Sequence, residues 1–136
     1  MGDSRSSWFS LKRFVVALAT TAVGAAAGML FVPFVGTYLG TLAGGFAAGL
    51  AFEDRPILEA GVAGVLAGLG ATLASVFVGN GIIGAIIGLF ELSPQILLIS
   101  AVLSFGVGAL GAHFGNDLRD GLTEPVEEPG RQPDGL

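Results

Sequence analysis

Long apolar runs separated by short polar segments dominate the hydrophobic pattern of this chain. No charged residue falls within 14–52, 60–90 or 92–112. Uncharged apolar runs of about 20 residues are typical of helices that span a lipid bilayer. A helix on the surface of a water-soluble protein needs a polar face, and these runs lack one. The pattern therefore predicts an all-α, polytopic membrane protein.

The lengths of the apolar runs predict four transmembrane helices. One helix over 14–52 would be about 58 Å long, roughly twice the hydrocarbon thickness of a bilayer. Pro33 removes a backbone donor inside that run, so the chain is expected to turn back at Val32–Thr37. The transmembrane domain is predicted to cover 14–115. Its spans are expected at about 14–32, 36–52, 57–78 and 95–114.

The second half of the chain contains an apolar stretch that is too short to cross a bilayer. Gly79–Asn80–Gly81 is a strong turn signal, and the stretch 82–90 that follows would form only about 13 Å of helix. We expect a short interfacial or re-entrant helix there, with Ser93 as the N-cap of the last span. The acidic tail 116–136 has too few apolar residues to form a core and is expected to be disordered in water.

Glycine and alanine recur at every fourth position in the predicted spans, and the stretch 34–52 carries two such series side by side. Residues four apart share one face of a helix, and in lipid a smooth small-residue face lets a second helix approach closely. The glycines predicted to pack helices together are Gly36, Gly40, Gly44, Gly45, Gly49, Gly64, Gly68, Gly108 and Gly111.

The small-residue faces also suggest how the spans pair. The glycine stripe of the second span and the face of the third span that contains Gly64 and Gly68 are expected to pack against each other as a hairpin. All four spans carry small-residue faces, which is more than the helix contacts within a single four-helix bundle require. We therefore expect the protein to pack with itself, as a homo-oligomer, or with a larger membrane complex in the lipid bilayer.

Composition excludes several classes of function. The chain has 136 residues, of which 52% are hydrophobic and 12% charged, about half of the charged fraction of a soluble domain. The absence of cysteine excludes disulfides and thiol chemistry. The net charge of −5 argues against a nucleic-acid partner, because such partners require a basic patch.

The positive charges predict the topology. With four spans, every Lys and Arg falls on one side of the membrane, and positive loops favour the cytoplasm. Both termini, including the polar segment 1–13, and the loop at 53–56 are therefore expected in the cytoplasm. The basic pair Lys12–Arg13 before an apolar run also resembles a signal peptide. The run continues beyond any cleavage point, so processing of the N-terminus stays open.

Few residues offer chemistry. Glu59, one turn into the third span, is either an ion-handling carboxylate or an interfacial acid paired with Arg55 at helical spacing, and we favour the pair. Glu91 either gathers cations at a pore mouth or stays in water, and His113 has no second metal ligand. No catalytic set, cofactor fingerprint or metal cluster is present in the sequence. We expect a non-enzymatic protein, with a small oligomeric channel or transporter as the alternative.

Several motifs of the chain resemble a known family. These are the proline turn at Val32–Thr37, a GG-x-x-AG helix at 44–49, a short charged loop, a G-x-x-AG helix at 64–68 and the segment GALGAHFG at 108–115. The pattern is similar to that of a small membrane-protein family of haloarchaea classed only as a domain of unknown function. The resemblance implies a four-helix membrane protein from a halophilic archaeon and assigns no functional residue.

Overall fold

The computed structural model describes residues 8–125, which form four α-helices and no strand. The helices are α1 (Leu11–Phe31), α2 (Val35–Ala51), α3 (Ile57–Glu91) and α4 (Pro94–Thr123). Three of them, α1, α3 and α4, are long and apolar enough to cross a membrane, and α2 is a shorter apolar helix of 17 residues. The all-α prediction is therefore confirmed, with three long candidate spans and one shorter helix.

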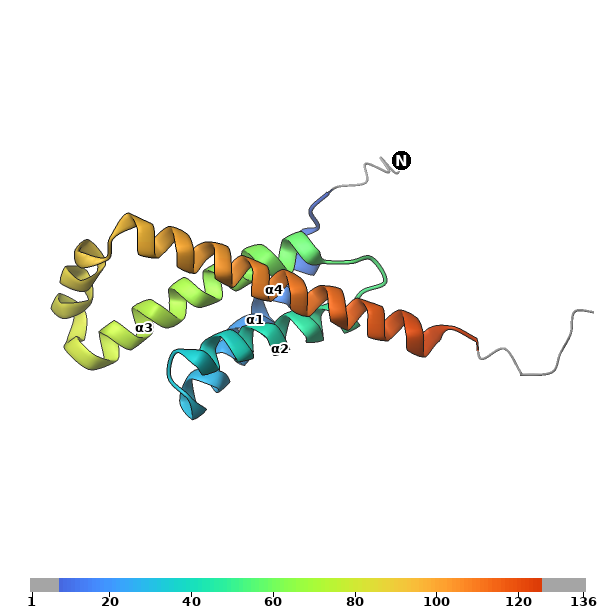
Figure 1. The fold of residues 1–136 in the computed structure, drawn as a ribbon, viewed down its shortest axis with the longest axis horizontal. Helices are drawn as coiled ribbons and strands as arrows, with labels where there is room; N and C mark the ends of the chain where they lie inside the picture. The colour runs from blue at the N-terminus through green and yellow to red at the C-terminus, as the bar shows by residue number, and fades with distance from the viewer. Residues whose placement is uncertain (1–7, 126–136) are drawn as a thin grey trace, which may run out of the picture.

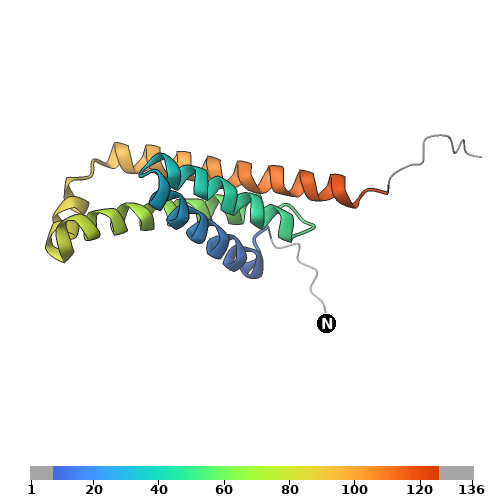
Figure 2. The ribbon, with the colours of Figure 1, turned by 90° about the horizontal axis from the view of Figure 1, so that it is seen from below.

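The four helices form an up-and-down bundle in which α1 and α2 make a hairpin beside α3 and α4 (Figure 1). Figure 2 shows α2 lying between α1 and α4. The most extensive contacts of α2 are with α1 and α4, and those with α3 are sparse. The predicted pairing of the α2 glycine stripe with α3 is therefore wrong. That stripe meets Gly24 and Gly28 of α1, which are small enough to let the backbones touch.

The turn between α1 and α2 is tighter than a β-turn. Phe34 has φ 72° and ψ −68°, and the amide of Val35 donates to the carbonyl of Pro33 over 3.0 Å. These values describe a classic γ-turn, a strained conformation for a residue with a side chain. The chain therefore reverses within the predicted segment Val32–Thr37, and α1 and α2 pack antiparallel from their first shared turn.

A single glycine breaks α3 where the sequence predicts a turn. Gly81 has φ 68° and ψ −173°, a combination that essentially only glycine adopts. The helical residues after it, 82–91, match the predicted short helix, and Figure 1 shows this piece bridging the separated ends of α3 and α4. Ser93 caps α4 as predicted, because its hydroxyl accepts from the amide of Ile96.

The ends of the helices differ from the predicted spans in one important place. The expectation of disorder from residue 116 is wrong for 116–123, because α4 continues to Thr123. Polar residues of this extension, among them Asn116 and Asp117, bond to the α2–α3 loop, and these bonds compensate for the few apolar residues. At the other end α1 already begins at Leu11. The rest of both predicted tails, 1–7 and 126–136, lies outside the described residues.

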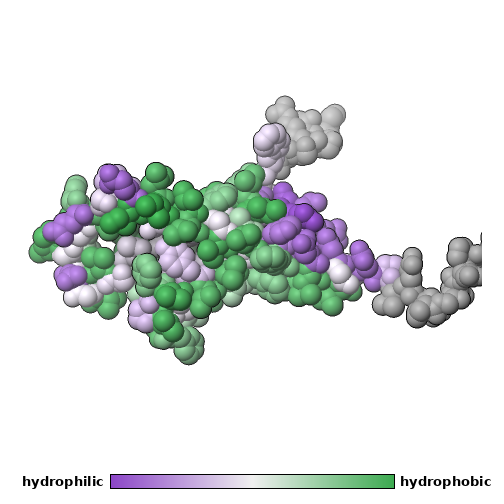
Figure 3. Space-filling model, viewed as in Figure 1, coloured by the Kyte–Doolittle hydropathy of each residue, from purple (hydrophilic) through white to green (hydrophobic). Residues whose placement is uncertain are grey.

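The core of the bundle consists of small residues, and the large apolar residues point outward. The buried hydrophobic residues within 8–125 are all alanines, whereas Leu30 is 86% exposed and Phe90 is 87% exposed. Figure 3 shows hydrophobic residues covering much of the visible middle of the bundle, with hydrophilic residues gathered over the α2–α3 loop and the end of α4. An apolar surface of this extent marks a membrane or protein contact rather than a water interface.

Candidate functional site

The nine predicted packing glycines all lie where two helices touch. At eight of them an added Cβ atom would meet the backbone of a neighbouring helix, and at Gly68 it would meet the hydroxyl of Ser104. Gly45 and Gly49 of α2 face Gly108 and Ala112 of α4. These faces are used inside one copy of the chain. Within one copy, α1 covers one glycine face of α2 and α4 covers the other.

Glu59 lies at the charged end of the bundle and has two partners on α1. Its side chain is 2% exposed, and its Oε1 accepts from the backbone amide of Ser10 over 2.9 Å. The same oxygen is 3.3 Å from Nε of Arg13, which also lies 3.7 Å from Asp54. Glu59 is the third residue of α3 and contacts the start of α1, so two helix N-termini favour its negative charge.

The predicted pairing of Glu59 with Arg55 is wrong. Arg55 instead bonds to Asp117 of α4 over 3.1 Å. The helix begins only at Ile57, with Pro56 as its N-cap, so Arg55 is outside the helix and the spacing of four residues does not place it beside Glu59. His113 lies 3.4 Å from Asp117, and residues 8–125 contain no group of three metal-binding side chains.

Asn116 is a structural residue that sequence reasoning missed. It is 1% exposed, and its Nδ2 donates to the carbonyls of Phe52 over 2.9 Å and of Glu53 over 3.2 Å. These carbonyls directly follow the end of α2, so the bonds tie the start of the α2–α3 loop to α4. The only signal in the sequence was a polar residue in the small-residue register of α4, four positions after Ala112.

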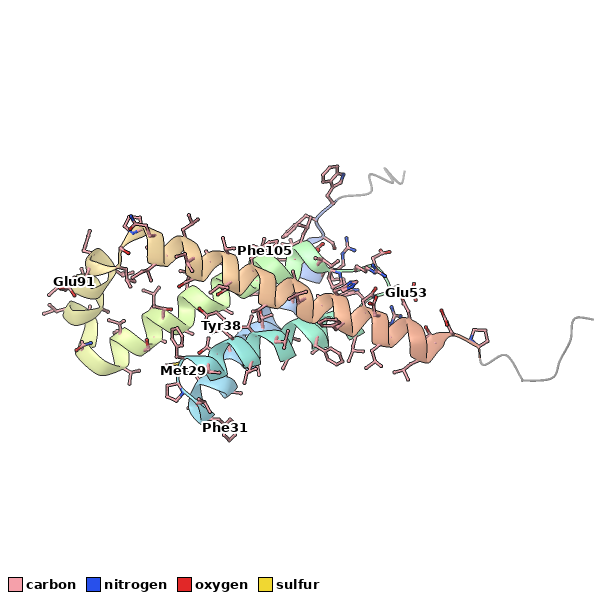
Figure 4. All side chains as sticks on the ribbon, in the orientation of Figure 1. Met29, Phe31, Tyr38, Glu53, Glu91 and Phe105 are labelled. Carbon is pink, nitrogen blue, oxygen red and sulfur yellow. The ribbon has the colours of Figure 1, made fainter. Side chains whose placement is uncertain are left out.

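The charged residues are distributed unequally between the two ends of the bundle. Arg13, Arg55 and Arg119 all bind acids at the end that carries the α2–α3 loop. Glu91 is exposed and is the only charged residue among 8–125 at the opposite end. Figure 4 shows Glu53 and Glu91 at these two ends. Glu91 therefore has no described partner for ion binding or pairing.

A cavity of about 370 Å³ lies at the end opposite the charged cluster. It is bounded by the turn of the α1–α2 hairpin, the middle of α3 and the first half of α4. Figure 4 shows Met29 and Tyr38, two of its lining residues, near that turn. The lining is mostly apolar and contains hydroxyl side chains from three helices. The sequence does not indicate that Thr37 and Tyr38 share a cavity with α3 and α4, because that convergence depends on the tertiary fold.

A comparison with protein families finds a match. The model of a family described as a domain of unknown function, DUF8526, matches residues 11–124, which include all four helices. No curated protein and no solved structure matches the chain. The resemblance to a domain of unknown function is thereby confirmed, whereas the match says nothing of the organism or of a membrane.

Proposed function

The chain belongs to the DUF8526 family, and from its geometry we propose a non-enzymatic, four-span membrane protein that assembles with a second copy of itself. α2 is the proposed fourth span. Its 17 residues carry no charge and make about 25 Å of helix, within the range of short spans. The clustering of Arg13, Arg55 and Arg119 at one end supports placing that end and both termini in the cytoplasm. The net charge of −5 supports a halophilic archaeal source.

One observation carries the assembly proposal. α2 presents Ala43, Ala47 and Ala51, spaced four apart, on its exposed side, whereas α3 and α4 expose large side chains such as Leu66 and Val102. In lipid a small-residue stripe gains contacts only when another helix covers it closely. The two inner faces of α2 already pack against small-residue stripes. The outer stripe of a second copy would match this one in the same way.

Native mass spectrometry of the full-length protein, extracted gently from its membrane, tests the proposal. We expect a closed homo-oligomer, and monomers for the double variant Ala43→Leu with Ala47→Leu, because the added bulk separates the helices. Val102→Leu on the exposed face of α4 is the matched control and should leave the oligomer intact. A monomeric wild type would refute self-assembly, and an unchanged oligomer in the double variant would refute the alanine stripe of α2 as the interface. Co-purification with a larger protein would instead support an accessory subunit.

A small oligomeric channel or transporter is the second candidate, favoured by the hydroxyl-lined cavity opposite the charged end. The pairing of Glu59 with Arg13 argues against a free ion-handling carboxylate in the bundle. Ion flux into vesicles that contain the wild type or Glu59→Gln distinguishes a transport role from a purely structural role of Glu59. Flux that requires Glu59 would support transport, and absence of flux under any gradient would exclude it.

A further inference from the structure

The cavity owes its existence to the way α3 and α4 separate. The two helices touch where Gly64 meets the carbonyl of Ser104, and Figure 1 shows them diverging from there toward the end bridged by residues 82–91. Pro33 and Phe34 of the hairpin turn reach the resulting space from the side of α2. Its volume of about 370 Å³ lies in the range of ligand pockets, about 300–1,000 Å³.

The lining determines the charge of any ligand. No acid, lysine, arginine or histidine contributes to the cavity, and most of the exposed lining is apolar. Moving a charged group into such a space without a partner costs several kcal/mol or more. A ligand that fits is therefore uncharged and largely apolar.

The lining also carries hydroxyl groups to which a ligand could bond. Thr72 and Ser75 donate to carbonyls of their own helix, Gly68 and Thr72. Within residues 8–125 the hydroxyls of Tyr38 and Ser104 have no hydrogen-bond partner, although Ser104 is only 4% exposed. The Oγ atom of Ser104 is itself accessible from the cavity, and a hydroxyl within an apolar lining gains from a hydrogen-bond partner. A carbonyl or hydroxyl of a ligand would satisfy it.

We propose that this cavity binds an uncharged amphiphile, a molecule with one apolar chain and an uncharged head whose carbonyl or hydroxyl oxygen bonds to Ser104 and Tyr38. The turn of the hairpin forms one wall, where the rings of Phe34 and Tyr38 pack edge to face with centroids 5.7 Å apart. The apolar chain lies against Val65, Leu69 and Leu97. The site is separate from the outer alanine stripe of α2, so it does not depend on self-assembly.

Photolabelling of the full-length protein in lipid nanodiscs tests this site. The probe is a long-chain alcohol with a diazirine in its chain, and peptide mass spectrometry maps the labelled residues. We expect the label to concentrate on the cavity lining of α3 and α4. An excess of unlabelled monoacylglycerol should compete for labelling, whereas the corresponding fatty acid and phosphatidylglycerol should not, because both carry a charge.

Single variants assign the contacts. Ala101→Leu fills part of the cavity and should lower labelling of the lining at least about fivefold. Ser104→Ala and Tyr38→Phe should each raise the half-saturating probe concentration about fivefold, as one lost hydrogen bond predicts. Thr20→Ala on α1 is the matched control outside the cavity and should change it less than about twofold, since its hydroxyl already bonds to the carbonyl of Val16 within α1.

Three results would overturn the proposal. The first is labelling spread evenly over lipid-facing residues such as Leu98 and Leu110, without competition. The second is unchanged labelling in a folded Ala101→Leu variant. The third is equal competition by monoacylglycerol and phosphatidylglycerol, which would mean that the space takes any membrane lipid.

Discussion

At the scale of single residues, the ion pair of Glu59 with Arg13 holds the start of α1 against the start of α3. Arg13→Gln leaves the carboxylate of Glu59, which is 2% exposed, without its cation. We expect the free energy of unfolding to fall by about 1–3 kcal/mol, the cost of a buried polar group that loses its partner. Unfolding of the purified protein in SDS, followed by circular dichroism, measures this loss.

Arg55→Gln is the control for this prediction. The pair of Arg55 with Asp117 is about half exposed on both sides, so its loss should cost less than about 1 kcal/mol. A double-mutant cycle with Glu59→Gln should show coupling to Arg13 and none to Arg55. Coupling of Glu59 to Arg55 instead would restore the pairing that helical spacing suggested.

At the scale of the helices, α2 is stabilised by backbone contact on two sides. Gly40→Ala places a Cβ atom against the carbonyl of Gly24, and neither backbone can move without separating α1 from α2. We expect the variant to lose about 1–3 kcal/mol of unfolding free energy, the cost of overpacking. The same SDS titration measures it.

Gly106 of α4 offers a matched control for this substitution. An added Cβ atom there meets nothing within 4 Å, and alanine favours a helix over glycine by about 1 kcal/mol. Gly106→Ala should therefore leave stability unchanged or raise it. Equal losses in both variants would mean that the contact of α1 with α2 is not what Gly40 protects.

At the scale of the whole molecule, the proposed orientation places the charged end inside the cell. The chain contains no cysteine, so one can be introduced at each end. Asp54→Cys and Glu91→Cys lie on exposed residues at opposite ends of the bundle. With an impermeant maleimide and intact cells, we expect labelling at 91 only, and labelling at 54 after permeabilisation. The reverse pattern would invert the topology, and labelling at both would exclude a four-span arrangement.

Local physics explains which features could be predicted from the sequence. The turn at Pro33, the break at Gly81 and the cap at Ser93 each follow from the backbone preferences of one or two residues. The all-α class follows from uncharged runs that can satisfy their backbone groups in lipid only as helices. The register of the packing glycines follows from the helical repeat.

The tertiary structure alone decided which surfaces meet. A small-residue face favours close approach but does not specify its partner, so the sequence could not place the α2 stripe against Gly24 and Gly28 of α1 rather than against α3. The partner of Glu59 is Arg13 because α1 and α3 start side by side. The hydroxyl-lined cavity likewise exists only because α3 and α4 diverge. Pairings between distant segments depend on the crossing of whole helices, which no short stretch of residues determines.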